Sequence, residues 1–360
     1  MIWIVFLLAC ACFFAAVFPF VPMAHGFVRA FDFPRIQLAL LSAGALIVSV
    51  VFLAFDTLGR VTIAMSATAL IIQLSYIVRF TRLWWRRSKA FEGNVNDLPT
   101  IRLLVSNVKM GNRKYDLLQD LIKRQSPDIG LFMEVDSDWV NAINEVTTDY
   151  PHKLSCPQDT GYGLHLVSRF AFQSAEIKFL LNEDVPSFDI DLLHEDGATF
   201  RLIAIHPEPP VLDEDTVGRD AEIAVVGEEV RDYEKPLIVT GDLNDVAWSR
   251  TTRRFLRISR LIDPREGRGL FNTFDARYPF LRWPLDHIFH SPHFRLVAME
   301  RMPFVGSDHF PMFYNVALTE QQTGYRQTGQ ASKEDLNEAD DVIEKEKRRD
   351  DDPVGTDWEN

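Results

Sequence analysis

Cysteine is scarce in this chain, and so are the motifs that most often reveal a cofactor. The 360 residues include three cysteines, of which Cys10 and Cys12 lie in the first apolar run and Cys156 stands alone. This number and spacing exclude a disulfide framework and a zinc site built on cysteine pairs. There is no glycine-rich phosphate loop and no GxGxxG pattern, so the sequence lacks the signatures of P-loop nucleotidases and dinucleotide-binding domains.

An excess of positive charge is also lacking. The formal net charge is -13 at pH 7. Residues 1–96 hold eight Lys and Arg against three Asp and Glu, and residues 319–360 hold six against thirteen. The middle of the chain is therefore strongly acidic, which excludes a protein that grips long nucleic acid through bulk charge alone.

Three long apolar runs occupy the N-terminal quarter. They predict transmembrane helices over about residues 2–22, 36–55 and 61–78. A cleaved signal peptide would begin with a basic segment, and residues 1–6 have no basic side chain. A single run would fit a buried soluble helix, but three in succession predict an anchor whose partner is the lipid bilayer. The runs contain no charge pair, which disfavours a transporter or channel accessory.

From about residue 100 the pattern is that of a soluble α/β domain. We expect a basic juxtamembrane linker over 81–99, a folded domain over 100–318 and a disordered acidic tail over 319–360, whose apolar content is too low to offset chain ordering. Within the domain, buried strands and amphipathic helices alternate. The predicted strands are 101–108, 129–135, 163–170, 200–206 and 236–244, and the predicted helices are 114–126, 219–233 and 249–262.

Polar side chains stand where these strands end. Each one alone reads most simply as a cap, a turn residue or a solvated group, and this includes the adjacent acid and imidazole of GSDHFP. Together they form a set of carboxylates, amides and imidazoles, which is the set that hard divalent metals and phosphate chemistry use. The positions are Asn107, Glu134, His206, Asp242, Asn244, Asp286, Asp308 and His309.

In this order and spacing, the segments SNV, FMEV, AIHPEPP, GDLN, WPLDHI and SDHFP resemble those of the endonuclease/exonuclease/phosphatase superfamily. GLHLVSRF is similar to the family strand that ends in Ser-Arg, here Ser168 and Arg169. Each motif alone is a modest signal, but the ordered set is specific and covers about residues 101–318. The resemblance implies an α+β fold of the deoxyribonuclease-I-like type, a four-layer α/β/β/α sandwich, preceded here by three transmembrane helices.

The resemblance also implies a role for each residue of the set. His309 would act at the scissile phosphate, and Asp286 would fix its tautomer. Asp242 would orient or deprotonate the attacking water, and Asn244 would donate to a non-bridging oxygen as charge builds there. His206 would hydrogen-bond the phosphate or protonate the leaving oxygen.

A metal cofactor is implied as well, because an acidic site can approach an anionic ester only with a cation in between. Glu134, supported by Asn107, would hold one Mg²⁺, with Mn²⁺ as the alternative, and Asp308 would lie beside the metal or the phosphate. Lys109 stands where some members carry a second acid, which weakens a two-metal arrangement. His165 stands where many members have a small residue.

The implied activity is metal-dependent hydrolysis of a phosphodiester or a phosphomonoester. The substrate stays open between nucleic acid, phospholipid and inositol phosphate, and no protein partner is predicted. Four arginines of the predicted helix 249–262 read more simply as a solvated face than as a nucleic-acid site. The alternative is a catalytically silent, membrane-tethered binding or scaffold module, which the complete set of polar residues disfavours.

We expect an integral protein of a bacterial inner (plasma) membrane. Arg29, Arg35 and the segment RFTRLWWRRSK share one side of a three-span anchor, so the positive-inside rule places the domain in the cytoplasm. The resemblance points the other way, because membrane-anchored relatives of this kind place the catalytic domain outside. The side of the membrane stays open.

Overall fold

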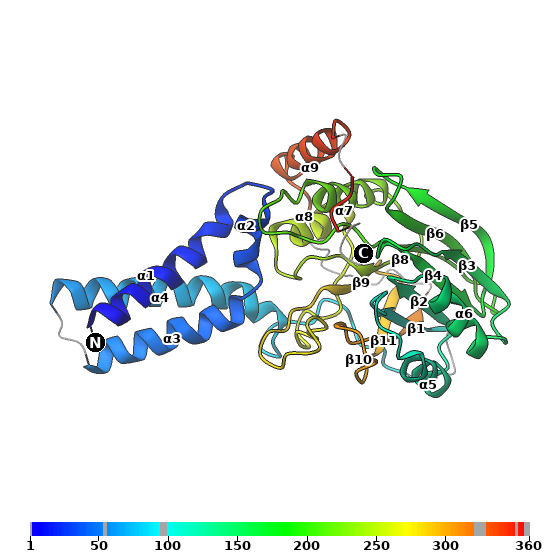
Figure 1. The fold of residues 1–360 in the computed structure, drawn as a ribbon, viewed down its shortest axis with the longest axis horizontal. Coiled ribbons are helices and arrows are strands. Elements are labelled where there is room, and N and C mark those ends of the chain that lie inside the picture. The colour runs from blue at the N-terminus through cyan, green and yellow to red at the C-terminus, as the bar shows by residue number, and fades with distance from the viewer. Residues whose placement is uncertain (1, 53–55, 94–98, 320–328, 350–351, 356–360) are drawn as a thin grey trace. The chain divides into compact units, whose positions relative to one another are not determined.

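The computed structural model shown in Figure 1 describes residues 2–52, 56–93, 99–319, 329–349 and 352–355. The chain forms two compact units, and each is described by itself. The first comprises residues 1–85 with the loops 210–216 and 267–269, and the second comprises the remaining residues.

Three long helices build the first unit. α1 (Ile2–Val17), α3 (Arg35–Phe52) and α4 (Thr57–Ile77) lie side by side (Figure 1) and pack through small residues such as Ala9 and Ala69. All three are long and apolar enough to cross a membrane, and they coincide with the predicted spans. The end of the second predicted span, residues 53–55, lies outside the described residues. Shorter turns accompany the helices: η1 (Phe18–Phe20), α2 (Gly26–Arg29), η2 (Ala30–Asp32) and η3 (Val78–Phe80).

Two β-sheets form the second unit. The first has the order β10-β11-β1-β2-β4-β3 and the second has the order β5-β6-β7-β8-β9. Only β1 with β2 and β7 with β8 pair in parallel, and a helix crosses over between the strands of each parallel pair. The strands are β1 (Thr100–Asn107), β2 (Ile129–Met133), β3 (His152–Cys156), β4 (Leu164–Ser168), β5 (Ala171–Phe179), β6 (Pro186–Leu193), β7 (Thr199–Ala204), β8 (Leu237–Asp242), β9 (Asp286–His290), β10 (Phe294–Arg301) and β11 (Met312–Leu318).

The two sheets pack face to face, and helices cover their outer faces. Alternate residues of β1 show the layering: Leu103 and Val105 join the core between the sheets, whereas Leu104 joins the cluster under α5 (Tyr115–Gln125) and α6 (Ser137–Val146). α7 (Val217–Glu229) and α8 (Arg250–Ser259) cover the second sheet in the same way. The predicted four-layer α/β/β/α sandwich is confirmed.

Part of the predicted linker belongs to the folded domain. Arg87 pairs with Glu266 at 2.6 Å, and Ala90 pairs with Leu296 of β10. The linker prediction therefore needs correction over these residues, because β10 offers a free edge that the segment can pair with. Residues 94–98 lie outside the described residues.

The predicted disorder of residues 319–360 is wrong for the segment that forms helix α9 (Lys333–Glu346). Ser332 and Asp335 form a capping box at its start, and Val342 and Ile343 pack against α7 and α8. Low overall apolar content hid this helix, because its few apolar residues are all on one face. Residues 320–328, 350–351 and 356–360 lie outside the described residues.

Opposite charges hold α9 on α8. Asp335 pairs with Arg257 at 2.5 Å, and Glu338 pairs with Arg254, at 3.4 Å, and with Arg250. Three arginines of the basic helix therefore face acids of the tail. The interpretation as a solvated face covered Arg253, Arg254, Arg257 and Arg260, and it is corrected for Arg254 and Arg257, which pair with acids of α9.

Truncation after Leu318 should destabilise the protein. It removes the buried Val342 and Ile343 and leaves the half-buried arginines of α8 without acidic partners. We expect a fall in Tm of about 4 °C or more, since 1 kcal/mol shifts the Tm of a domain of this size by about 2–4 °C. The measurement is thermal unfolding of the detergent-solubilised chain. As the matched control, Glu344→Ala removes an exposed acid of the same helix and should leave Tm unchanged. An unchanged Tm on truncation would mean that α9 does not dock in solution.

Candidate active site

Strand direction brings the predicted residues to one edge of the two sheets. β1 and β2 run parallel, so Asn107 at the end of β1 lies beside Glu134, which directly follows β2. In the second sheet, Asp242 ends β8 and is the register partner of Asp286, which begins the antiparallel β9. Asn107 Nδ2 donates to Asp242 Oδ2 at 3.1 Å, so the edges of both sheets meet at this point.

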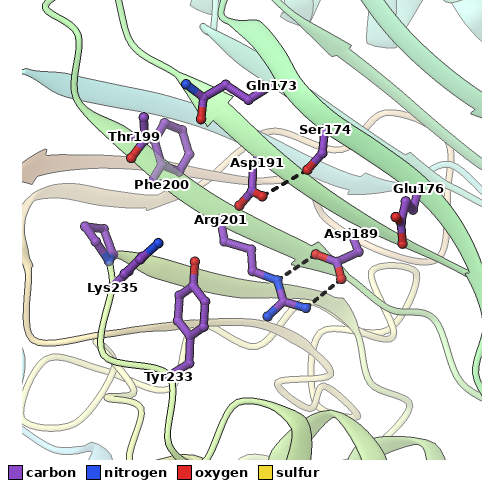
Figure 2. Close-up of a pocket in the computed structure, with 11 residues that line it drawn as sticks. Gln173, Ser174, Glu176, Asp189, Asp191, Thr199, Phe200, Arg201, Tyr233 and Lys235 are labelled. Atoms are coloured by element: carbon purple, nitrogen blue, oxygen red, sulfur yellow. Dashed lines mark hydrogen bonds and ion pairs between the residues drawn. The ribbon is translucent and has the colours of Figure 1, made fainter.

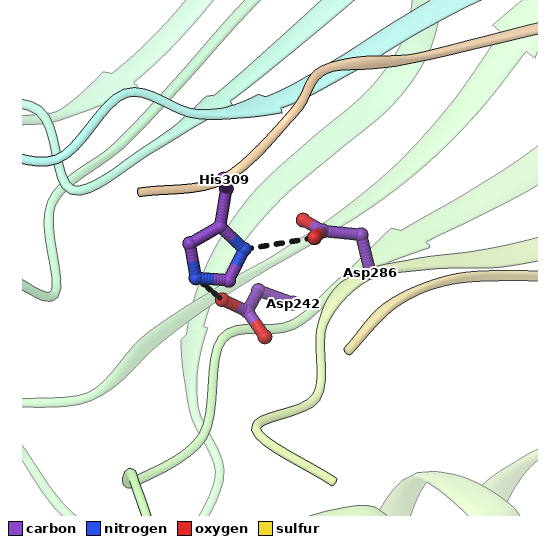
Figure 3. A group of neighbouring side chains, drawn as sticks. All are labelled: Asp242, Asp286 and His309. Carbon is purple, nitrogen blue, oxygen red and sulfur yellow. Dashed lines mark hydrogen bonds and ion pairs between the residues drawn. The ribbon is translucent and has the colours of Figure 1, made fainter. Parts of the chain in front are cut away.

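His309 lies between the two acids of the second sheet (Figure 3). Its Nδ1 is 2.8 Å from Asp286 Oδ2, and its Nε2 is 3.3 Å from Asp242 Oδ2. All three side chains are buried. The segment before β11 carries His309 to this position. The backbone N–H of His309 donates to the hydroxyl of Ser307 at 3.0 Å. Both ring nitrogens therefore face carboxylates.

The two neighbouring carboxylates set the charge of His309. Burial by itself would lower the pKa of the imidazole, but Asp242 and Asp286 outweigh burial and raise the pKa to about 10. The imidazole is therefore protonated at neutral pH. Asp286 lies at Nδ1 of the ring, and its predicted role of fixing the tautomer stays a prediction. The two carboxylates stabilise the positive charge of the imidazolium.

Glu134 lies in an acidic and buried part of the site. Its Oε1 accepts a hydrogen bond from Asn107 Nδ2 at 2.6 Å. Burial, and then the charges of Asp308 and Asp242, raise the pKa of Glu134 to about 7, although the hydrogen bond from Asn107 opposes this. Repulsion among buried carboxylates means that an added cation would stabilise them, so this part of the site suits a hard divalent ion.

Lys109 already supplies a cation at the neighbouring acid. Its Nζ is 2.6 Å from Asp308 Oδ2. Burial lowers the pKa of Lys109, but the hydrogen bond and charge of Asp308 outweigh it, so the pKa is raised. From the sequence, Lys109 was interpreted only as a residue that weakens a two-metal arrangement. The structure shows that its ammonium group neutralises Asp308.

Asn244 and His206 complete the set on the side of the second sheet. Asn244 donates its backbone N–H to Asp242 Oδ1 at 3.0 Å, and its Nδ2 donates to the carbonyl of Pro207 at 2.9 Å. His206 is buried, which lowers its pKa, although Asp242 opposes this. The Nδ1 of His206 is buried and has no hydrogen-bond partner among the described residues.

Backbone strain is concentrated at the same edge. Glu134, Asn244 and Lys109 all adopt positive φ, at 57°, 52° and 58°, which is uncommon for residues with a side chain. Gly241 has φ 145°, and a Cβ atom there would lie 1.9 Å from the carbonyl oxygen of Ile205. Only glycine allows β8 to approach β7 closely directly before Asp242.

Three residues near the site were missed by the sequence analysis. The ring centroid of Phe274 is 4.9 Å from that of His309, and Arg277 Nη2 is 3.7 Å from Asp308 Oδ2. The ring of Tyr162 is 5.9 Å from that of His206. All three lie in irregular segments. The alternation that predicts side-chain direction along a strand does not apply there. No local signal in the sequence could have found them.

His165 is not part of this site. It is buried within β4, its Nδ1 is 2.7 Å from the hydroxyl of Ser155, and burial lowers its pKa to about 4. Ser168 and Arg169, which the sequence analysis compared with a family strand, lie at the far end of β4. Arg169 pairs there with Asp149 at 2.7 Å.

A separate cavity of about 320 Å³ lies over β5, β6 and β7 (Figure 2). Three of its charged groups already have partners: Arg201 donates two hydrogen bonds to Asp189, at 2.7 and 2.6 Å, and Asp191 accepts one from Ser174 at 2.9 Å. None of the predicted site residues lines this cavity. This cavity is therefore separate from the candidate active site.

Two groups of residues could hold a metal ion. Ligand atoms of Asp242, Asp286 and His309 all lie within 4.8 Å of one another. In that group, however, the imidazolium already lies between the two carboxylates, and an ion would have to displace its proton. The second group is Glu134 with Asn107, where the carboxylate forms no ion pair within 4.0 Å among the described residues.

The profile of the Endonuclease/Exonuclease/phosphatase family matches residues 104–309, which is more than half of the chain. The chain belongs to this family. No curated protein matches the sequence. The matched segment includes every predicted site residue.

Solved structures share the fold at low sequence identity. The human Nocturnin catalytic domain with bound sulfate is 17% identical with a TM-score of 0.52, and the match covers 62% of this chain and 96% of that chain. A family protein from Bacteroides thetaiotaomicron is 19% identical with a TM-score of 0.50, covering 61% and 98%. D. rerio TDP2 complexed with a single strand DNA product is 15% identical with a TM-score of 0.50, covering 60% and 98%.

Substitutions should separate the two candidate metal groups. Glu134→Gln keeps the shape of the side chain and removes its charge, so it should weaken Mn²⁺ binding about tenfold or more if Glu134 is a ligand. Asp286→Asn should change the binding little, because Asp286 faces the imidazole. The measurement is electron paramagnetic resonance of Mn²⁺ titrated into the full-length chain in detergent, with Mg²⁺ as competitor and Asp191→Asn as control. The opposite pattern would place the ion at Asp242, Asp286 and His309.

Proposed function

We propose that this chain is a membrane-anchored, Mg²⁺-dependent phosphoesterase that hydrolyses a phosphodiester or phosphomonoester by attack of water. The observation that carries the proposal is the buried His309, whose two ring nitrogens face Asp242 and Asp286, next to the Glu134 carboxylate and the Asn107 amide that donates to it. A cation, an anion-binding donor and a base for water are the three needs of phosphoryl transfer to water.

The charge of His309 defines its part in the reaction. As an imidazolium it cannot accept a proton from water. Its Nε2 N–H faces Asp242 at 3.3 Å in the structure, and a bound phosphoryl oxygen would take over this hydrogen bond. That hydrogen bond strengthens as negative charge builds on the oxygen in the transition state. Asp286 holds the ring in place through Nδ1 and stabilises its positive charge.

Asp242 acts as the base. It takes a proton from the water whose oxygen forms the new bond to phosphorus, while the bond from phosphorus to the ester oxygen breaks and the leaving oxygen takes up a proton from solvent. Asn244 uses one N–H of its amide for Pro207 and keeps the second for a non-bridging oxygen. His206 is neutral, so it binds the phosphate as a hydrogen-bond donor and does not serve as the acid.

Glu134 and Asn107 would hold a single Mg²⁺, which when bound supplies Lewis-acid polarisation of the phosphoryl group. In the structure the amide of Asn107 points its Nδ2 at Glu134, so the amide would turn to present Oδ1 to an ion. Lys109 supports the one-metal proposal, because its ammonium group takes the place of a second cation at Asp308.

The proposal is tested with a panel of phosphate esters. The full-length chain is assayed on nucleic acids, sphingomyelin and inositol phosphates with and without Mg²⁺. His309→Ala should lower kcat by about 10²–10⁴ on the substrate that is cleaved, measured below the Tm of the variant because His309 is buried between two carboxylates. Asp286→Asn should lower kcat by a smaller factor, because the amide occupies the same place as the carboxylate but no longer stabilises an imidazolium.

The double variant provides the internal control. His309 and Asp286 act as one unit, so combining the two changes should cost much less than the product of the single effects. Multiplicative losses would assign Asp286 another role. A His309→Ala enzyme as active as the parent would sink the proposed function.

The pH profile tests the protonation of His309. The folded-state pKa of about 10 is above the ordinary value of 6.5, so activity that needs the imidazolium persists at neutral pH and falls as pH rises through about 10. Asp286→Asn removes one of the two charges that raise this pKa. The alkaline limb of kcat/KM should therefore move down by about 1–3 pH units. Asp191→Asn, which removes a distant acid, should leave the limb unchanged, and an unmoved limb in Asp286→Asn would contradict this account.

A further inference from the structure

A hairpin with an apolar tip forms part of the rim of the site. Thr273 and Phe274 donate backbone hydrogen bonds to the carbonyl of Trp283, each at 3.0 Å, so residues 273–283 form what we call the rim hairpin. Its tip is the segment Tyr-Pro-Phe-Leu. Tyr278 is 53% exposed, Phe280 85% and Leu281 48%. Three large apolar side chains in water at one tip mark a contact surface.

The rim hairpin is attached directly to the catalytic segment. Phe274 pairs with His309, and the backbone N–H of Ala276 donates to the carbonyl of Asp308 at 2.6 Å. Phe310 donates its N–H to the carbonyl of Thr273 at 3.0 Å. A surface that the tip contacts is therefore held next to the phosphate site.

Basic residues accompany the apolar tip. The guanidinium groups of Arg282 and Arg301 lie over the ring of Phe310, at 4.9 and 4.5 Å, and neither forms an ion pair within the described part of the chain. Arg277 is half exposed and pairs with Asp275 within the hairpin. Phe304, which is 42% exposed, contacts the same Phe310 ring. Apolar tip and arginines together form the rim patch.

An anionic lipid surface fits the rim patch best. Aromatic, aliphatic and arginine side chains side by side suit the boundary between lipid headgroups and acyl chains. A nucleic-acid platform would use the aromatic faces of Tyr278 and Phe280 for stacking, but it would leave the exposed aliphatic Leu281 without a partner, which a lipid interface buries. The same chain carries three helices apolar enough to span a membrane. Only residues 81–89 separate the end of η3 from Ala90 of the folded domain, a reach on the order of 30 Å.

We propose that the tip of the rim hairpin inserts into the lipid interface and that the substrate is a phosphate ester carried by a lipid. The substrate part rests on the proposed function, and the insertion part does not. Burial of Phe280 and Leu281 in the interface draws the rim to the bilayer. The arginines of the rim patch bind lipid phosphates, which places an ester beside His309.

Depth measurement tests insertion without any activity. The full-length chain is reconstituted into vesicles of phosphatidylcholine and phosphatidylglycerol after Cys10, Cys12 and Cys156 are replaced by alanine. A nitrobenzoxadiazole label on Phe280→Cys should be quenched by spin-labelled lipid. The same label on Phe179→Cys, an exposed apolar position at the end of β5, should not be quenched. Equal, weak quenching at both positions would overturn the insertion.

Activity tests the lipid substrate. The Phe280→Ser/Leu281→Ser variant should lower kcat/KM on vesicle lipid about tenfold or more, since two apolar side chains lose their burial. It should leave hydrolysis of soluble bis(p-nitrophenyl) phosphate unchanged, and the control Phe179→Ser should affect neither.

The remaining outcomes also decide the question. Loss of single-stranded DNA cleavage in the tip variant, with vesicle hydrolysis unchanged, would overturn the proposal in favour of a nucleic-acid platform. If the parent hydrolyses soluble diester but no vesicle lipid, the substrate part is wrong and the proposed function stands. If the parent hydrolyses no ester, the proposed function fails, and the quenching experiment still decides insertion.

Discussion

The site depends on the burial of two like charges in neighbouring strands. Asp242 and Asp286 are register partners at the edge of β8 and β9, and both are almost fully buried. Two carboxylates cannot remain ionised there without a cation, because desolvation and mutual repulsion are both unfavourable. His309 provides that cation through both ring nitrogens. Orientation and protonation of the imidazole therefore follow from one electrostatic requirement, which ties the segment before β11 to the second sheet.

The same requirement joins the two sheets. Asn107 ends a strand of the first sheet, yet its amide donates to Glu134 and to Asp242 of the second sheet. The apolar core between the sheets must form before these groups meet. Lys109 and Asp308 extend the pattern, since a lysine within the chain balances an acid that would otherwise need another cation. Stability and chemistry are thus supplied by the same contacts.

Local patterns in the sequence predicted much of the domain and little of its periphery. Buried strands such as β1, β2 and β8 were found because each is a short apolar run that ends in a polar residue. The strands β3, β5, β6, β9, β10 and β11 were not among those predicted. β5, for example, has a polar exposed face and lacks such a run. Helix α9 was missed for a different reason: the low apolar content of the tail as a whole hid its capping box and its single apolar face, and its pairing with arginines of α8 depends on a distant segment.

The sequence by itself determined which strands end in Asn, Asp, Glu and His, since order and spacing along the chain are local properties. Only the tertiary structure decided how these residues act. The protonation of His309, the pairing of Lys109 with Asp308 and the position of Arg277 at the rim all depend on burial and on charges brought together from distant segments. Desolvation and Coulomb interactions depend on distance in space, and separation along the chain does not specify that distance.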